Sequence, residues 1–195
     1  MRPRDEPMTT PVAAESRAPL VATFSTPALM VDLGRFEANV AAMEALLGGT
    51  GKTVRPHVKT HRTPELARRQ LGGAAVGVTC ATVGEAEVMV AAGSTDVLVA
   101  NEVVDPAKIE RLVALAREAR VAVAADAAEP VERLARAAAA AGVPIEVLVD
   151  VDIGLHRCGV GSAQEAVQLA EVIARQPSLR FRGLMGYEGR IRLGV

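Results

Sequence analysis

Short aliphatic runs alternate along the chain with longer segments in which apolar residues recur at helical spacing. A run of four to eight aliphatic residues is typical of a strand buried on both faces, whereas spacings of three and four indicate an amphipathic helix. The predicted strands cover residues 28–33, 54–59, 75–82, 96–100, 121–125, 145–151 and 181–187. Strands that alternate with helices in this way are expected to be parallel.

Capping residues mark where the intervening helices begin and end. Capping side chains that precede a helical segment stand at Thr63, Thr82, Asp105 and Ser162. Proline follows the first and third of these, and a glutamate three positions on completes a capping box at the other two. Gly93 and Gly142 stand where C-terminal caps belong. These signals predict a repeated strand–helix unit.

Two parallel architectures fit such a repeat. A doubly wound sheet normally carries a glycine-rich nucleotide turn after its first strand, and no G-x-G-x-x-G sequence occurs there. A (β/α)8 TIM-type barrel gathers its chemistry at the carboxyl ends of the strands. The polar clusters here follow the predicted strands, at residues 57–61, 80–82, 101–102, 126 and 150–157. We therefore favour the barrel, truncated to about six strands, and expect its two open edges to make the chain poorly soluble by itself.

Composition excludes several classes of partner. The formal net charge is −1 and no long basic run occurs, so we expect no nucleic-acid partner. No apolar run reaches the ~18–20 residues of a membrane helix, and residues 1–25 lack the apolar segment of a secretory signal. We expect residues 1–25 to be a disordered leader. Two cysteines are too few for a disulfide framework, which fits the reducing cytoplasm.

Lysine is scarce, with three residues against nineteen arginines, so a lysine here draws attention as a primary amine. Lys59 lies in the sequence Arg55-Pro-His57-Val-Lys59-Thr-His61. Alternation along a strand would place Arg55, His57 and Lys59 on one face. Neighbouring positive charge then disfavours the ammonium form and frees a nucleophilic amine. A solvated, charged strand end is an equally acceptable interpretation.

A second cluster spans residues 150–161. Arg157 is placed either to hold an anionic oxygen of a cofactor or to pair with Asp152. Gly159-x-Gly161 before a helix either binds phosphate or, as we prefer, forms a tight turn. Cys158 is predicted to be a packing residue.

A third cluster ends the last predicted strand at Tyr187, the only tyrosine in the chain. Its ring is placed to stack on another ring or to relay a proton, or it is a rim residue without a chemical role.

Taken together, the segments TPALMVDL, RPHVKTH, GEAEVM, LVANEVV, VDIGLHRCGV and GLMGYEG resemble the fold-type III pyridoxal phosphate (PLP) enzymes of the D-threonine aldolase and D-serine dehydratase group. More distantly they are similar to the alanine racemase N-terminal domain. The resemblance implies that Lys59 forms the Schiff base with the cofactor, with His57 beside it. It also implies that Arg157 contacts the phenolic oxygen and that Tyr187 lies against the pyridine ring.

The resemblance also implies a domain organisation. Residues 26–34 correspond to a strand of a C-terminal β-domain, and residues 35–195 to an incomplete PLP-binding barrel. The family's phosphate loops, its divalent-metal site and the remaining strands have no counterpart here, so we assign no metal ligand. We expect an N-terminal fragment that is inactive alone, and a homodimer in the full-length parent.

The implied function is a cytoplasmic PLP-dependent lyase that acts on small D-amino acids, as a D-threonine aldolase or a D-serine dehydratase. An amino-acid racemase of the alanine racemase type and a non-catalytic PLP-binding protein are the alternatives.

Overall fold

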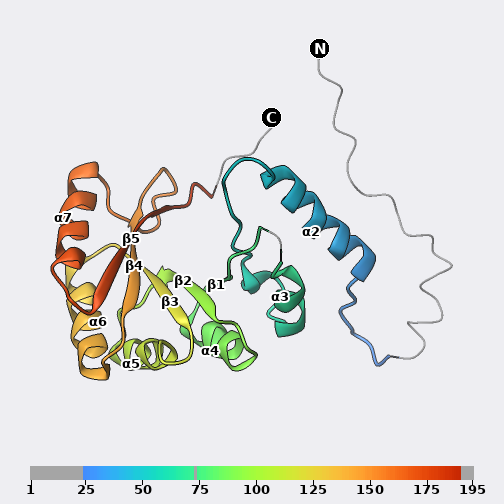
Figure 1. Ribbon diagram of the computed structural model, residues 1–195, viewed down its shortest axis with the longest axis horizontal. Helices are drawn as coiled ribbons and strands as arrows, with labels where there is room; N and C mark the ends of the chain where they lie inside the picture. Colours follow the sequence, from blue (N-terminus) through green and yellow to red (C-terminus); the bar gives the residue numbers. More distant parts are fainter. Residues whose placement is uncertain (1–23, 73, 190–195) are drawn as a thin grey trace, which may run out of the picture. The chain divides into compact units, whose positions relative to one another are not determined.

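The computed structural model of the chain describes residues 24–72 and 74–189 (Figure 1). The chain divides into two compact units, residues 1–39 and 40–195. Helix α2 (Leu33–Leu47) begins in the first unit, where Asp32 Oδ1 accepts a 3.1 Å hydrogen bond from the backbone N–H of Arg35. The strand predicted at 28–33 does not form among the described residues, because Leu33 is already helical and residues 26–32 have no strand partner there. Apart from residues 24 and 25, the predicted leader lies outside the described residues.

The second unit is built on five parallel strands. They are β1 (Val78–Cys80), β2 (Asp96–Glu102), β3 (Arg120–Ala125), β4 (Ile145–Val151) and β5 (Leu179–Gly186). Their order in the sheet is β1-β2-β3-β4-β5, the same as their order along the chain. A doubly wound sheet reverses its order at a switch point, and no reversal occurs in these strands. The predicted α/β barrel, incomplete rather than closed, is therefore confirmed.

Helices connect successive strands and cover one face of the sheet (Figure 1). They are α4 (Val83–Ala91), α5 (Pro106–Leu115), α6 (Ala128–Ala141) and α7 (Ala163–Ala174). Alternate residues of the strands, such as Val97, Val99 and Val147, are fully buried against the apolar stripes of these helices. Burial of this aliphatic surface is the main stabilising contribution to the unit.

The predicted caps hold at three of the four helix starts. Thr82 Oγ1 accepts a hydrogen bond from the N–H of Glu85, Asp105 Oδ1 from that of Lys108, and Ser162 Oγ from that of Glu165. Thr63 precedes α3 (Pro64–Gln70) without a side-chain cap, because its hydroxyl donates to the carbonyl of His61 instead. Gly142, at φ +68°, ends α6, and Gly93, at φ +95°, follows the C-cap of α4, as predicted.

The strand predicted at 54–59 is reduced to two isolated bridges, Val54 with Ala75 and His57 with Thr79. Pro56 has no N–H to donate to a ladder, and residues Val58–Thr60 turn into the 3-10 helix η2. The prediction of a regular strand ending at Lys59 was therefore wrong. The segment still runs parallel to β1.

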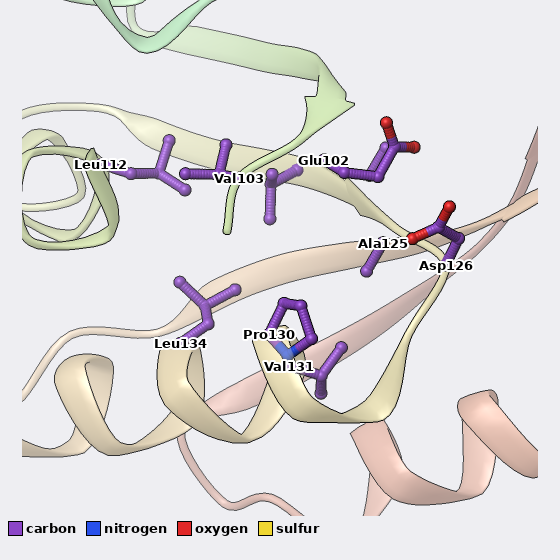
Figure 2. Close-up of a pocket in the computed structure, with 10 residues that line it drawn as sticks. Glu102, Val103, Leu112, Ala125, Asp126, Pro130, Val131 and Leu134 are labelled. Carbon is purple, nitrogen blue, oxygen red and sulfur yellow. The ribbon is translucent and has the colours of Figure 1, made fainter. Parts of the chain in front are cut away.

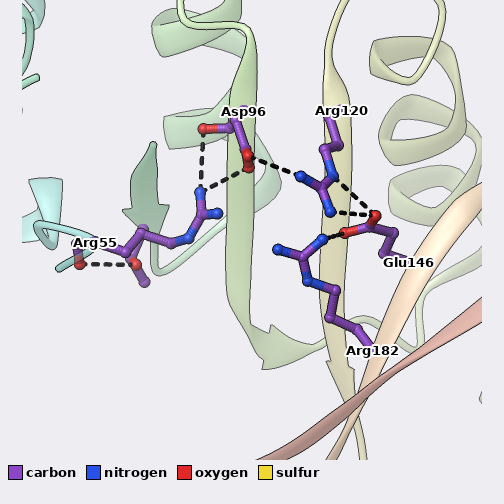
Figure 3. Close-up of polar contacts among 6 residues, drawn as sticks. Arg55, Asp96, Arg120, Glu146 and Arg182 are labelled. Carbon is purple, nitrogen blue, oxygen red and sulfur yellow. Dashed lines mark hydrogen bonds and ion pairs between the residues drawn. The ribbon is translucent and has the colours of Figure 1, made fainter. Parts of the chain in front are cut away.

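A ladder of alternating charges links the amino-terminal ends of the strands (Figure 3). Asp96 pairs with Arg55 at 2.7 Å and with Arg120 at 3.5 Å. Glu146 pairs with Arg120 at 2.8 Å and with Arg182 at 2.6 Å. Asp96, Arg120, Glu146 and Arg182 belong to the successive strands β2, β3, β4 and β5, so their pairs favour one register of the sheet. Arg55 reaches Asp96 from the segment that lies beside β1. It lies at the opposite end of the strands from the polar clusters singled out in the sequence.

No helix among residues 24–72 and 74–189 is both long enough and apolar enough to cross a lipid bilayer.

Candidate active site

Four successive strands bring polar side chains to the carboxyl-terminal edge of the sheet. Glu102 is the last residue of β2, Asp126 follows β3, Asp150 is the penultimate residue of β4, and Tyr187 follows β5. Because the strands are parallel, these ends share one edge. In barrels of this kind that edge carries the chemistry.

Glu102 and Asp126 form the polar end of a pocket between β2, β3 and the helices α5 and α6 (Figure 2). The rest of the pocket lining is apolar and includes Leu112, Val131 and Leu134. Glu102 Oε1 is buried and has no hydrogen-bond partner within the described part of the chain. Burial, followed by the interaction with Asp150 and the charge of Asp126, raises the pKa of Glu102.

Lys59 lies exposed in η2, at the same edge of the sheet. The fully buried Val58 anchors the turn, and the Nδ1 atom of His57 accepts a 3.4 Å hydrogen bond from the backbone N–H of Lys59. Burial, and next the charge of Lys59, lower the pKa of His57, so its imidazole is neutral near pH 7. The structure therefore places His57 directly beside the lysine.

Arg55 does not belong to this cluster, contrary to the prediction that Arg55, His57 and Lys59 share a face. The turn at η2 breaks the alternation of a strand, and the guanidinium of Arg55 is held by Asp96 at the opposite edge.

His61 has a structural role. Its Nδ1 accepts a 3.0 Å hydrogen bond from the N–H of Thr63, and its Nε2 lies 3.0 Å from Oε1 of Gln70.

The loop after β4 is organised by Asp152. Its Oδ1 accepts hydrogen bonds of 3.0 Å from the backbone N–H groups of Gly154 and His156, and its Oδ2 lies 2.7 Å from Nδ1 of His156. These contacts, the backbone ones first, lower the pKa of Asp152 to about 2. Asp152 is thus engaged by His156, and no ion pair joins it to Arg157 in the described structure.

Gly159 and Gly161 lie in bends on either side of Val160, which forms an isolated bridge with Val151. The N–H of Gly159 donates to Oδ2 of Asp126 at 3.1 Å, and that of Gly161 donates to Oε2 of Glu165 at 2.8 Å. Protein carboxylates therefore occupy both N–H groups that a phosphate would need. Gly159 is required by geometry, since it has φ +100° and a Cβ there would lie 2.6 Å from the backbone N of Asp152.

Arg157 and Tyr187 meet at the end of this loop. The Cζ atom of Arg157 lies 5.4 Å from the centroid of the Tyr187 ring, within the range of a cation–π contact. Both side chains are exposed. Two of the residues that the sequence assigned to cofactor binding are thus brought together.

The same loop packs on the end of β5. A Cβ on Gly186 would lie 3.0 Å from Cδ1 of Ile153, and one on Gly189 would lie 2.9 Å from Cδ1 of Leu155. The small residues of the Gly-Tyr-Glu-Gly segment therefore leave room for the loop that carries Arg157.

Sequence reasoning noted Glu102 and Asp150 as polar strand ends but did not assign them to the site. Their carboxylate oxygens and Sγ of Cys158 all lie within 4.8 Å of one another. The available signal was positional, because each acid lies at or just after the carboxyl end of a predicted aliphatic strand.

The two thiols are both shielded. Burial raises the pKa of Cys80 to about 12, so that thiol is inert near neutral pH. Burial also raises the pKa of Cys158, whose Sγ donates to Oδ2 of Asp150 at 3.3 Å. This environment disfavours the thiolate form of Cys158.

Residues 31–191 match the family model described as alanine racemase, N-terminal domain. The chain is 42% identical over 182 residues to a D-threonine aldolase of Arthrobacter sp., which covers 93% of this chain and 48% of the relative. It is 39% identical over 168 residues to a 3-hydroxy-D-aspartate aldolase of Paracoccus denitrificans, covering 85% and 43% of the two proteins.

Solved structures of an aldolase and a dehydratase are also similar to this chain. The crystal structure of D-threonine aldolase from Filomicrobium marinum has a TM-score of 0.83 and 45% identity, covering 85% of this chain and 45% of that one. D-threo-3-hydroxyaspartate dehydratase from Delftia sp. HT23 has a TM-score of 0.74 and 31% identity, covering 84% and 44%. The chain spans less than half the length of these relatives.

Proposed function

The chain belongs to the alanine racemase N-terminal domain family, and from this premise we propose that it binds pyridoxal phosphate and supports lyase chemistry on small D-amino acids. The observation that carries the proposal is the contact between Arg157 and Tyr187 at the edge of the sheet that also holds Lys59. An amine, a guanidinium and an aromatic ring are the groups that recognise an aldehyde, a phenolate and a pyridine ring.

The described residues fit this cofactor. Lys59 is an exposed primary amine at this edge and would hold the cofactor through its aldehyde group. Arg157 has no carboxylate ion pair within the described residues, so its guanidinium is available to the phenolic oxygen. Tyr187 offers a ring face, and the neutral His57 holds the turn that carries Lys59.

Pyridoxal phosphate supplies an electron-withdrawing ring, which stabilises negative charge that develops at the α-carbon of the substrate. The residues of this chain bind and orient the group. The proposal assigns the contacts to Lys59, His57, Arg157 and Tyr187, and it assigns no divalent metal to this chain.

The proposed substrate class is a small D-amino acid with a hydroxyl on its β-carbon. The names of relatives that are 42% and 39% identical describe aldolases of such compounds, and the dehydratase acts on another. An aldolase breaks the Cα–Cβ bond and releases an aldehyde. A dehydratase removes the α-proton and the β-hydroxyl group from its substrate. We place the aldolase first because the aldolases are the more similar relatives.

Racemisation is the second candidate function. An alanine racemase of Mycolicibacterium smegmatis is 30% identical over 186 residues, which cover 93% of this chain and 44% of that protein. Its lower identity places it behind the lyases.

Borohydride reduction tests the cofactor assignment. The chain is incubated with pyridoxal phosphate, reduced so that the C=N bond becomes a stable C–N bond, and digested with trypsin. We expect the mass increase on the peptide of residues 53–62, which contains Lys59. Lys52 and Lys108 are internal controls, and labelling mainly on either of them would contradict the assignment.

A chimera tests the reaction. Residues 24–189 of this chain replace the matching segment of the Arthrobacter D-threonine aldolase, whose remaining length is retained. We expect D-threonine to be cleaved to glycine and acetaldehyde, and we expect Lys59→Ala to abolish the cleavage. A folded chimera that binds pyridoxal phosphate yet releases no aldehyde, but interconverts D- and L-alanine, would favour the racemase.

A further inference from the structure

Two carboxyl groups and a thiol form a compact cluster at the carboxyl-terminal edge of the sheet. Glu102 ends β2, Asp150 lies near the end of β4, and Cys158 belongs to the loop that follows β4. Their side-chain oxygens and sulfur lie within 4.8 Å of one another. Asp150 is only 3% exposed, and the thiol of Cys158 donates a 3.3 Å hydrogen bond to its Oδ2.

The cluster places two carboxyl groups within 4.8 Å of each other in a partly buried site. Neither Glu102 nor Asp150 forms an ion pair with a lysine or arginine within the described part of the chain, and Glu102 Oε1 is buried without a partner. Asp126, which follows β3, adds a third carboxylate nearby. Two carboxylates this close in a shielded site do not both ionise readily, because each charge disfavours the other and burial disfavours both.

Arg157 is the cation that precedes Cys158 in the loop after β4, whereas Lys108 and Arg111 line a pocket with Glu102 on the α5 side. The side chain of Cys158, and then the charges of Glu102 and Asp150, hold the pKa of the guanidinium above its ordinary value. Arg157 is adjacent in sequence to Cys158, whose thiol donates to Asp150, and the carboxyl oxygens of Asp150 and Glu102 lie within 4.8 Å of each other. Arg157 is exposed, and its guanidinium lies over the Tyr187 ring.

We propose that Glu102 and Asp150 share one proton, so that a single negative charge on the pair, relayed by Cys158, holds Arg157 over Tyr187. Glu102 and Asp150 are then positioning residues, since they act on a bound group only through Arg157. The positioning role rests on the proposed function, whereas the shared proton does not.

A shared proton also explains why the cluster tolerates burial. The neutral Glu102 avoids the cost of an unpaired buried charge, while the remaining charge on Asp150 is offset by the Cys158 thiol and by Arg157. The buried Oε1 of Glu102 then belongs to a neutral carboxyl, for which an unpaired oxygen costs less than for an anion.

Infrared spectroscopy tests the shared proton without any cofactor. A protonated carboxylic acid has a carbonyl stretch that is separate from the carboxylate bands. We expect this band at pH 7 in the unmodified chain and in the control Glu110→Gln, which changes an exposed residue of α5. We expect it to be absent in Glu102→Gln. Absence of the band from the unmodified chain at pH 7 would overturn the proposal.

The pH at which the band disappears gives a second readout. The charged and titratable groups near Glu102 include Asp126 after β3, Asp150 on β4, and Arg157 and Cys158 in the following loop. Asp105, Lys108 and Arg111 line a pocket with Glu102 on its other side. Removing the negative charge in Asp150→Asn should let Glu102 ionise at lower pH than in the unmodified chain. A band that titrates at the same pH in both proteins would show that the two carboxyls do not share a proton.

Cofactor binding tests the positioning role. With pyridoxal phosphate on the chain, Arg157→Ala and Asp150→Asn should shift the visible absorption band in the same direction. Each should also raise the Kd about tenfold, the loss expected for one charge-assisted hydrogen bond. Glu110→Gln should retain the unmodified band and Kd. A band that moves in Arg157→Ala but not in Asp150→Asn would overturn the positioning role.

A second pair of variants is used if Asp150→Asn does not fold by circular dichroism. Cys158→Ser retains a donor to Asp150, whereas Cys158→Val removes it. The valine variant should reproduce the band shift of Arg157→Ala, and the serine variant should keep the band of the unmodified chain. Equal spectra for the two variants would overturn the relay through Cys158.

The two parts of the proposal fail separately. Absence of any borohydride labelling at Lys59 would remove the cofactor assignment and the positioning role with it. The infrared band would still show whether Glu102 and Asp150 share a proton.

Discussion

The guanidinium carbon of Arg157 lies 5.4 Å from the centre of the Tyr187 ring, although the two residues follow different strands. An exposed contact of this kind contributes only about 0.5–1 kcal/mol to stability. Its interest is geometric, because it fixes a cation and an aromatic face side by side at the edge that carries Lys59.

Replacing Arg157 should affect chemistry more than stability. In the chimera with the Arthrobacter aldolase, Arg157→Ala is expected to lower kcat for D-threonine cleavage by about two orders of magnitude, the effect of losing one preorganised electrostatic contact. The matched control is Arg175→Ala, which changes an exposed arginine at the end of α7. Unchanged kcat and unchanged cofactor affinity in Arg157→Ala would contradict the assigned role.

Two substitutions at Tyr187 distinguish the contribution of its aromatic ring to cofactor affinity from that of its hydroxyl group. Tyr187→Phe keeps the aromatic face and should leave the Kd for pyridoxal phosphate within about twofold. Tyr187→Ala removes the face and should raise the Kd about three- to tenfold, which corresponds to ~1 kcal/mol. Fluorescence titration measures both. Equal losses in the two variants would assign the effect to the hydroxyl instead.

Gly159 should be intolerant of a side chain. Its positive φ and the 2.6 Å approach of a Cβ to the backbone of Asp152 predict that Gly159→Ala destabilises the protein by about 3–5 kcal/mol. Gly154→Ala is the control, because Gly154 has a similar φ of +117° but no atom within 4 Å of a Cβ. That variant should lose only about 1–2 kcal/mol. Urea unfolding compares the two, and similar losses would show that strain alone, without the close approach, sets the cost.

The loop after β4 should weaken in acid through Asp152. Its folded-state pKa of about 2 lies below its ordinary value of 3.8, so its contribution to stability is present above pH 3.8 and is lost as the pH falls towards 2. The urea midpoints of the unmodified protein and Asp152→Ala should therefore differ by a constant amount above about pH 5 and converge below pH 4. A difference that does not change with pH would show that the carboxylate charge is not responsible.

The charge ladder at the amino-terminal edge should stabilise the sheet. The side chain of Arg55 is only 15% exposed, so Asp96→Ala leaves a largely shielded cation without its partner. The expected loss is about 2–3 kcal/mol in the free energy of unfolding. Glu171→Ala breaks an exposed pair with Arg175 and should change stability by no more than about 0.5 kcal/mol. Equal effects in the two variants would show that the ladder is no stronger than a surface pair.

The order of strands and helices could be predicted from the sequence because the signals that specify it are local. Aliphatic runs set the strands from β1 to β5, and the capping side chains of Thr82, Asp105 and Ser162 set the helix starts within a few residues. The location of Lys59, Arg157 and Tyr187 at one edge of the sheet could be predicted as well, because parallel strands have all their carboxyl ends on one side.

The tertiary structure decided which of those edge residues meet. Arg55 pairs with Asp96 rather than joining Lys59, because a proline and a 3-10 turn interrupt the strand that alternation assumed. Glu102, Asp150 and Cys158 converge only because the register of β2, β3 and β4 and the path of one loop bring them within 4.8 Å. Register and loop path depend on contacts between residues far apart along the chain, and no local pattern encodes them.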